Sequence, residues 1–212
     1  MACGVDEAGR GPVIGPMVVA GVCASREVLE NLGVRDSKKL SPKRREFLAG
    51  EIKKIADSIA IRVVEPEEID EMRERMTINE MEVRIFAEII SKLGGEVIYL
   101  DAADVNEERF ADKIIANLSY SPRIISKHKA DDIYPEVSAA SIIAKVERDK
   151  IIRRIAEEIG DFGSGYPADE RTKEFLKSYY EKHGELPPHV RRSWKSAKRL
   201  LRSEKQRSLD SF

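Results

Sequence analysis

Amide side chains, cysteines and histidines are all scarce in this chain of 212 residues. Gln occurs once and Asn four times, whereas charged residues make up 35% of the sequence. This combination is typical of thermophilic proteins, although solubility alone also favours it. The three His and two Cys have no spacing typical of a zinc site, and one pair of cysteines provides no disulfide framework. We therefore expect Cys3 and Cys23 to be small buried thiols in a reducing compartment.

Long apolar runs are also absent. No run is long enough to span a bilayer and no signal peptide precedes the first expected strand, so we expect a cytoplasmic protein. Hydrophobic residues still make up 42% of the chain, which is enough for a substantial core. The net charge of −1 says little, but acids gather at 65–74 and 104–108 and bases at 189–205. The basic segment can hold nucleic acid locally.

Strand and helix patterns alternate along the chain. Apolar, β-branched runs predict strands, and cap residues such as Thr77 with Glu80 predict helix starts. The expected strands are 2–7, 13–24, 58–64, 96–100 and 123–127, and the expected helices are 42–56, a short one from Pro66, 77–93, 106–118, 135–159, 169–182 and 188–203. This order predicts an α/β fold, with a mixed β-sheet flanked by helices.

Acidic side chains stand at the ends of three expected strands. Asp6 and Glu7 end the first strand, Asp101 ends the fourth, and Asp131 follows the fifth. Open α/β sheets place their sites at the carboxyl ends of strands, so we expect these acids to converge on a hard cation. Helix capping is the alternative, and for Asp101 alone it explains the position equally well. Carboxylates without a His or Cys cluster favour Mg²⁺ or Mn²⁺, and two such ions can clamp a reacting phosphodiester.

The first pair of acids raises a geometric problem. Neighbouring side chains of a regular strand point to opposite faces, so Asp6 and Glu7 can serve one site only if the strand ends or bulges there. Gly9 makes such a break possible. The turn Gly9–Arg10–Gly11 also exposes backbone groups to a substrate, although without the adjacent acids a plain hairpin would be the better interpretation.

Five sequence motifs follow one another in a recognisable order. They are Gly4–Gly11, Asp36–Leu40, His128–Asp131, Ser138–Val146 and Gly163–Tyr166. With these motifs the chain resembles ribonuclease HII, most closely its archaeal members, from about residue 2 to 200. The resemblance implies an RNase H-like catalytic domain at 1–165, a helical C-terminal part at 166–203 and a flexible tail at 204–212.

The resemblance also implies an activity. Members of the family are endonucleases that hydrolyse the RNA strand of RNA–DNA hybrids and cut at ribonucleotides embedded in duplex DNA. We expect hydrolysis by two metal ions, leaving 3′-hydroxyl and 5′-phosphate ends, and a monomeric protein. The four catalytic and metal-binding acids fall on Asp6, Glu7, Asp101 and Asp131.

Substrate contacts come from other motifs. The resemblance implies that Gly9, Arg10 and Gly11 recognise the 2′-hydroxyl group, that Lys38 and Lys39 contact phosphates, and that the Tyr166 ring stacks on the sugar at the RNA–DNA junction. Ser138, Ser141 and Lys145 share a helix and are candidate contacts to the DNA strand. The small residues of that helix also indicate close packing on the sheet, and His128 is either a surface residue or a helper of proton transfer.

The last seven residues form a separate motif. Gln206, Leu209 and Phe212 stand at relative positions 1, 4 and 7, as in the box by which partner proteins bind a sliding clamp. The usual box has two consecutive aromatic residues, whereas this chain has one, and a frayed tail is the alternative. We expect the tail to bind a sliding clamp.

Two other classes of function compete with the nuclease. A nucleotide-binding module would use the glycine turn for phosphate, but the turn lacks a Walker lysine and serine. A non-catalytic clamp-bound adaptor needs only the tail and leaves the strand-end acids unexplained. Metal-dependent cleavage of a labelled hybrid separates all three.

Overall fold

The computed structural model describes residues 1–34 and 40–209, with side chains described up to residue 202. Its sheet has five strands in the order β3-β2-β1-β4-β5. The strands are β1 (Ala2–Ala8), β2 (Met17–Cys23), β3 (Ser58–Val64), β4 (Val97–Asp101) and β5 (Arg123–Lys127). β1 pairs antiparallel with β2 and parallel with β4, and β4 pairs parallel with β5. The predicted mixed sheet is confirmed.

The chain divides into two compact units that are each discontinuous in sequence. Unit 1 comprises Met1–Ala8, Val18–Val63 and Met76–Arg148, and unit 2 comprises Gly9–Met17, Val64–Arg75 and Asp149–Phe212. The domains expected from the sequence were continuous segments with boundaries at residues 165 and 203. They do not coincide with these units, and that division stays a prediction.

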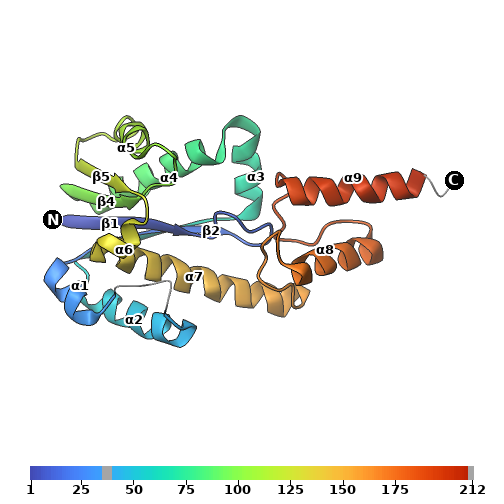
Figure 1. Cartoon of the computed structure of the whole chain (residues 1–212), viewed down its shortest axis with the longest axis horizontal. Helices are drawn as coiled ribbons and strands as arrows, with labels where there is room; N and C mark the ends of the chain where they lie inside the picture. Colours follow the sequence, from blue (N-terminus) through green and yellow to red (C-terminus); the bar gives the residue numbers. More distant parts are fainter. Residues whose placement is uncertain (35–39, 210–212) are drawn as a thin grey trace. The chain divides into compact units, whose positions relative to one another are not determined.

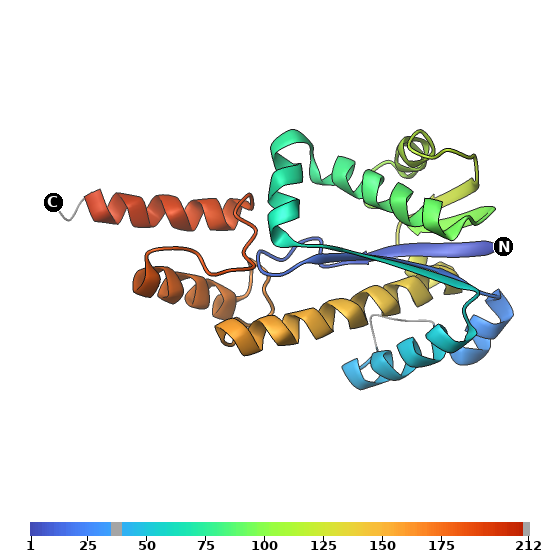
Figure 2. The same ribbon diagram turned by 180° about the vertical axis from the view of Figure 1, so that it is seen from behind.

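Helices cover both faces of the sheet in unit 1. Figures 1 and 2 show α4 and α5 on one face and α1, α2 and the first part of α7 on the other. The helices that lie in or begin in this unit are α1 (Arg26–Leu32), α2 (Pro42–Ile55), α4 (Ile78–Leu93), α5 (Glu107–Ile115), α6 (Ala130–Ile133) and α7 (Pro135–Ile159). Contact between α7 and β1 is close, because a Cβ atom at Gly4 would lie 2.1 Å from the backbone carbon of Glu136. The close packing expected for this helix is therefore confirmed.

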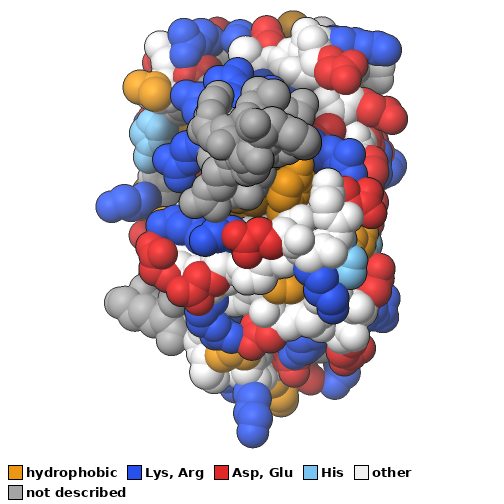
Figure 3. Space-filling view, turned by 90° about the vertical axis from the view of Figure 1, so that its right-hand side faces the viewer, with side chains coloured by type: hydrophobic (Ala, Val, Ile, Leu, Met, Phe, Trp, Pro, Cys, Tyr) orange, Lys and Arg blue, Asp and Glu red, His pale blue; other side chains and the backbone are white. Residues whose placement is uncertain are grey.

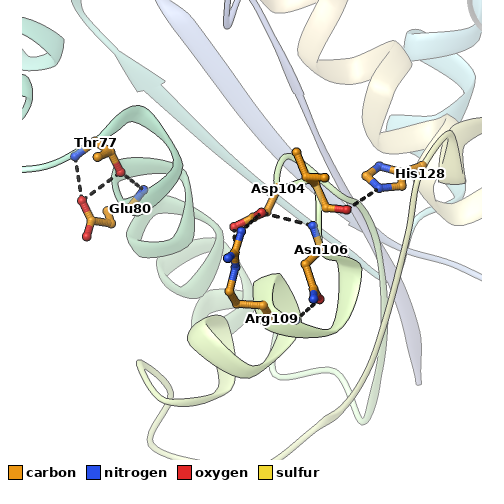
Figure 4. Close-up of polar contacts among 7 residues, drawn as sticks. Thr77, Glu80, Asp104, Asn106, Arg109 and His128 are labelled. Carbon is orange, nitrogen blue, oxygen red and sulfur yellow. Dashed lines mark hydrogen bonds and ion pairs between the residues drawn. The ribbon is translucent and has the colours of Figure 1, made fainter.

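Local cap chemistry fixes the start of α4 as the sequence predicts. Thr77 Oγ1 accepts a hydrogen bond from the Glu80 N–H at 3.3 Å, and Glu80 Oε2 accepts one from the Thr77 N–H at 2.7 Å (Figure 4). Two amide donors that a helix start leaves unpaired are satisfied in this way. The capping box is confirmed.

The two cysteines are not free thiols. Cys3 and Cys23 form a disulfide with their Cα atoms 4.0 Å apart. The antiparallel register of β1 and β2 places them directly opposite each other, which their positions in the sequence do not reveal. The expectation of buried thiols is therefore wrong.

Unit 2 has its own hydrophobic core. It contains α3 (Pro66–Arg75), α8 (Glu170–His183), α9 (Lys195–Leu209) and the end of α7. The core residues are Val13, Ile14, Ile155, Phe162, Leu176, Leu186, Val190 and Ala197. The helix expected at 188–203 begins later, because Ile14 forms a bridge with Val190 and holds that segment extended. Among the described residues, no helix has both the length and the apolar character needed to cross a membrane.

Candidate active site

Asp6 and Glu7 lie in a regular part of β1. The strand pairs with β2 through Ala8, with Asp6 opposite Ala20 and Glu7 opposite Val19. The strand therefore has no bulge at the acids, and it ends at Ala8, one residue after Glu7. The Asp6 side chain is buried, whereas Glu7 is partly exposed. Their side chains leave the strand on opposite faces because consecutive residues of a regular strand alternate.

Asp6 has Asp101 as its neighbour on the adjacent parallel strand. Val5 of β1 pairs with Leu100 of β4, so the next residue of each strand, Asp6 and Asp101, lies at the same level of the sheet. Burial, the negative charge of Glu7 and that of Asp101 raise the pKa of Asp6 well above its usual value. A hydrogen bond from Ser141 and the charge of Lys145 act in the opposite direction.

Asp101 also fixes the position of the segment that carries Asp131. Its Oδ1 accepts a hydrogen bond at 3.0 Å from the N–H of Ala130, the first residue of α6. Lys129, just before this helix, has the unusual backbone angle φ of 56°. Asp131 is the next residue of the helix and is buried. Asp101 therefore binds the first amide of a helix 29 residues later, which differs from the capping of a following helix weighed above, while it lies beside Asp6.

The four acids do not form a closed ligand set. Among the described residues, no three His, Cys, Asp or Glu side chains lie together in a way that could hold a metal ion. The regular strand directs Glu7 to the face opposite Asp6, and Asp101 Oδ1 accepts a hydrogen bond from the Ala130 amide. The charges of Glu7 and Asp101 nevertheless both act on the Asp6 carboxylate. The expected metal-binding role of the four acids stays a prediction.

Ser138 and Ser141 are fully buried. Ser138 Oγ donates a hydrogen bond to the Val34 carbonyl, and Ser141 is hydrogen-bonded to Asp6. Their expected contact with a DNA strand is therefore not available here, because the small residues of α7 pack against the sheet. Lys145 is partly exposed, and its charge acts on the Asp6 carboxylate.

An ion pair between the buried Asp104 and the exposed Arg109 fixes the loop after Asp101 (Figure 4). Asp104 is 3% exposed and accepts hydrogen bonds from the Asn106 N–H at 3.2 Å and from Arg109 Nε at 3.2 Å, with a second bond from Arg109 Nη2. These bonds, above all those from the guanidinium, lower the pKa of Asp104 to about 2. The sequence analysis did not predict the contact between Asp104 and Arg109. The helix cap at Asn106, which accepts a hydrogen bond from the Arg109 N–H, was a local signal for it.

His128 belongs to the same loop anchor. Its ring Nε2 lies 3.3 Å from the Val105 carbonyl (Figure 4). Its N–H donates to Glu107 Oε1 at 2.7 Å. The side chain is exposed. Two roles were left open for His128, and these contacts favour that of a surface residue.

The glycine turn and Tyr166 come together within unit 2. Gly9 has φ of 85°, and the N–H groups of Val13 and Ile14 both donate to the Gly165 carbonyl, at 2.8 and 3.3 Å. A Cβ atom at Gly11 would lie 3.4 Å from Tyr166 Cε1, at van der Waals contact, so the turn lies directly against the ring. The Tyr166 side chain is 44% exposed. Two motifs far apart in sequence thus form one surface that presents backbone groups beside an aromatic ring.

The remaining expected contacts fall at the limits of the described chain. Lys38 and Lys39 lie outside the described residues, as does Phe212. Gln206 and Leu209 belong to the backbone of α9, and their side chains are not described. Figure 3 looks at the side on which α8 and α9 lie, and there Lys and Arg side chains are interspersed with Asp and Glu.

Comparison with known proteins identifies the family. The model of the family described as ribonuclease HII matches residues 3–197. Ribonuclease HII of Thermococcus kodakarensis is 50% identical, over 99% of this chain and 96% of its own length. The protein of the same name from Pyrococcus furiosus is 49% identical, over 99% of this chain and 96% of its own length.

Solved structures agree. The crystal structure of ribonuclease H2 from Pyrococcus horikoshii has a TM-score of 0.91 and 44% identity, covering 96% of this chain and 98% of that one. Ribonuclease HII in a complex with PCNA from Archaeoglobus fulgidus has a TM-score of 0.87 and 49% identity, covering 94% of this chain and 96% of that one. Bst-RNase HIII in complex with Mn²⁺ (TM-score 0.79, 22% identity, 97% of this chain and 70% of that one) shares the fold. The chain therefore belongs to the ribonuclease HII family and is an endonuclease of the hydrolase class.

Proposed function

We propose that the protein cleaves the RNA strand of RNA–DNA hybrids and also cuts duplex DNA at embedded ribonucleotides, leaving 3′-hydroxyl and 5′-phosphate ends. One observation carries the proposal beyond family membership. Asp6 is buried at the same level of the sheet as Asp101, where two carboxylates repel each other. Such an arrangement costs stability, and nuclease chemistry gives a reason for it.

Mg²⁺ or Mn²⁺ fits the residues that are present. The donors are carboxylate oxygens alone, which suit hard cations. Burial, and then the charges of Glu7 and Asp101, raise the pKa of Asp6, so a bound cation would stabilise its charged form. A Mn²⁺-bound structure is known for the more distant Bst-RNase HIII. We propose that Asp6, Asp101 and Asp131 hold the ions of a two-metal site, and that Glu7, whose charge already acts on Asp6, joins them through a change at the end of β1, one residue further along the chain. Bound there, the ions would activate water and stabilise the charge that develops on the phosphodiester.

The chain's own residues prepare this site. Ser141 holds the Asp6 carboxylate by a hydrogen bond, and the charge of Lys145 offsets part of the repulsion. Asp101 holds the first turn of α6 and so fixes where Asp131 begins. In unit 2, the glycine turn and the Tyr166 ring read the sugar, because the 2′-hydroxyl group separates RNA from DNA.

A sliding clamp is the proposed partner. The ribonuclease HII of Archaeoglobus fulgidus has been solved in a complex with PCNA. In this chain, Gln206, Leu209 and Phe212 supply the corresponding box. Burial of the two apolar side chains in a clamp pocket would provide most of the affinity.

A cleavage assay tests the nuclease. A labelled RNA–DNA hybrid is incubated with Mg²⁺, with Mn²⁺ and with a chelator, using the parent protein and the variants Asp6→Asn and Asp101→Asn. We expect cleavage by the parent with either metal only, and loss of cleavage in both variants with the fold intact, because each removes one carboxylate from the site. Asp112→Asn is the matched control, since Asp112 is an exposed residue of α5. Near-normal turnover by Asp6→Asn at saturating Mg²⁺ would show that the site is misassigned.

A further inference from the structure

Arg191 is fully buried in unit 2 and binds the backbone of the glycine turn. Its guanidinium donates two hydrogen bonds to turn carbonyls, from Nη2 to Gly9 at 2.6 Å and from Nη1 to Arg10 at 3.0 Å, and a third from Nε to the carbonyl of the nearby Gly15 at 2.9 Å. The Arg191 N–H donates a fourth, to the Val13 carbonyl at 2.9 Å. One residue from the C-terminal part of the chain thus holds most of the turn.

Trp194 completes this contact. Its Nε1 donates to the Gly11 carbonyl at 3.1 Å, and its ring lies 4.8 Å from the central carbon of the Arg191 guanidinium. The carbonyls of all three residues of the Gly9–Arg10–Gly11 turn are therefore bound by this pair of side chains. The face of the aromatic ring also attracts the buried cation, which lowers the cost of burying its charge.

The direction of the carbonyls decides the direction of the amides. A trans peptide is planar, with its C=O and N–H groups pointing opposite ways, and no described peptide bond is cis. Because Arg191 binds the carbonyls of Gly9 and Arg10, the N–H groups of Arg10 and Gly11 point away from the guanidinium. These two donors are adjacent in the turn, which suits recognition of a single oxygen atom.

We propose that Arg191 is a positioning residue for sugar recognition, which orients the amides of Arg10 and Gly11 toward the 2′-hydroxyl group of a ribonucleotide. The inference rests on the proposed function, in which this turn reads the ribose. A flexible glycine turn would otherwise lose entropy on binding, and fixing it beforehand removes that cost.

The segment that carries Arg191 is itself anchored. Both Asp70 carboxylate oxygens on α3 accept backbone hydrogen bonds, from the N–H groups of Arg192 at 2.7 Å and Ser193 at 2.9 Å. The Ser193 hydroxyl donates to the same carboxylate at 2.5 Å. The backbone next to Arg191 is thus fixed, and its planar guanidinium has several donors in a rigid arrangement. A lysine, with a single ammonium group, cannot reproduce this geometry.

Binding without catalysis provides the test. Two duplexes of identical sequence, one all-DNA and one with a single ribonucleotide, are titrated in chelator with the parent, Arg191→Lys, Trp194→Phe and Arg192→Lys. We expect Arg191→Lys to lower the ratio of the two affinities by roughly tenfold, because lysine replaces a fork by one point donor. Trp194→Phe, which keeps a ring but loses the donor to Gly11, should lower it by a smaller factor. Arg192→Lys is the matched control, since this neighbouring side chain is exposed, and its ratio should stay at the parent's value.

The outcomes separate a positioning role from a structural one. Equal losses of affinity for both duplexes, or a lower melting temperature with an unchanged ratio, would overturn the inference. If Arg191→Lys does not fold, the ratio of the two duplex affinities measured with Trp194→Phe tests the inference instead. A parent protein that cleaves hybrids but does not favour the ribonucleotide duplex would overturn the role of the turn and this inference with it. A parent without any metal-dependent cleavage would instead overturn the proposed function itself.

Discussion

The negative charge of Asp6 lowers the stability of the folded protein. Burial and two neighbouring carboxylates raise its pKa in the folded chain above the unfolded value, so the native state binds this proton more tightly. Stability is therefore lost as pH rises from the unfolded pKa, about 3.9, through the folded pKa. The same charge is what would attract a divalent cation.

The variant Asp6→Asn should be more stable than the parent in chelator near neutral pH, because asparagine cannot ionise. The advantage should shrink as pH falls toward about 4, where the parent carboxyl is protonated as well. Added Mg²⁺ should also reduce it, since the cation stabilises only the parent. Urea unfolding across this pH range, with Asp112→Asn as the control, measures the difference. A variant less stable than the parent at neutral pH would contradict the repulsion.

Tyr166 is the residue that we expect to distinguish substrates. Its ring is 44% exposed and lies beside the glycine turn, which places it where a sugar can stack. Tyr166→Ala should slow cutting at a single embedded ribonucleotide more than cutting in a long hybrid, because the ring reads the deoxyribose that follows the RNA. Steady-state kinetics on both substrates measure the effect, and Tyr166→Phe, which keeps the ring, is the control. Equal losses on the two substrates would exclude this role.

Among the secondary-structure elements, β1 and β2 are covalently joined as well as hydrogen-bonded. The Cys3–Cys23 disulfide links residues 20 positions apart, so it restricts the unfolded chain. Closure of a loop of this size stabilises a protein by about 3 kcal/mol. The link holds the first strand, which carries Asp6, to its antiparallel neighbour.

Reductant should therefore lower the melting temperature of the parent protein. The double variant Cys3→Ala/Cys23→Ala should melt at a lower temperature than the oxidised parent and should not respond to reductant. Thermal unfolding with and without dithiothreitol measures both effects, and the double variant is the control for effects of the reagent. Two titratable thiols in the denatured, unreduced parent would show that the bond does not form.

For the whole molecule, the proposed clamp contact concerns only the last seven residues. Deleting 206–212 should leave cleavage of short oligonucleotides and thermal stability almost unchanged, because the acids, the turn and Tyr166 all lie elsewhere in the chain. Clamp binding should be lost, since burial of Leu209 and Phe212 contributes about 1.5–3 kcal/mol each.

Calorimetric titration into a trimeric sliding clamp measures this contact. The substitution Ser208→Ala within the tail is the matched control, because position 208 is not part of the box, and it should bind like the parent. Identical heats from the parent and the truncated protein would show that the tail does not reach the clamp.

The sequence by itself determined the elements and most of the chemistry. Helix starts such as Thr77 with Glu80 were predictable because a cap involves residues three positions apart. Acids at strand ends and glycines in turns were readable for the same reason, since each motif is a short local segment. The mixed sheet followed from the order of these elements.

Only the tertiary structure decided which residues meet. The register of β1 against β4 places Asp6 beside Asp101, and that of β1 against β2 pairs Cys3 with Cys23. The bond from Arg191 to the Gly9 carbonyl joins residues 182 positions apart. No local pattern encodes such contacts, because they depend on how complete strands and helices pack. Burial then decides whether a side chain binds a substrate or the protein's own backbone.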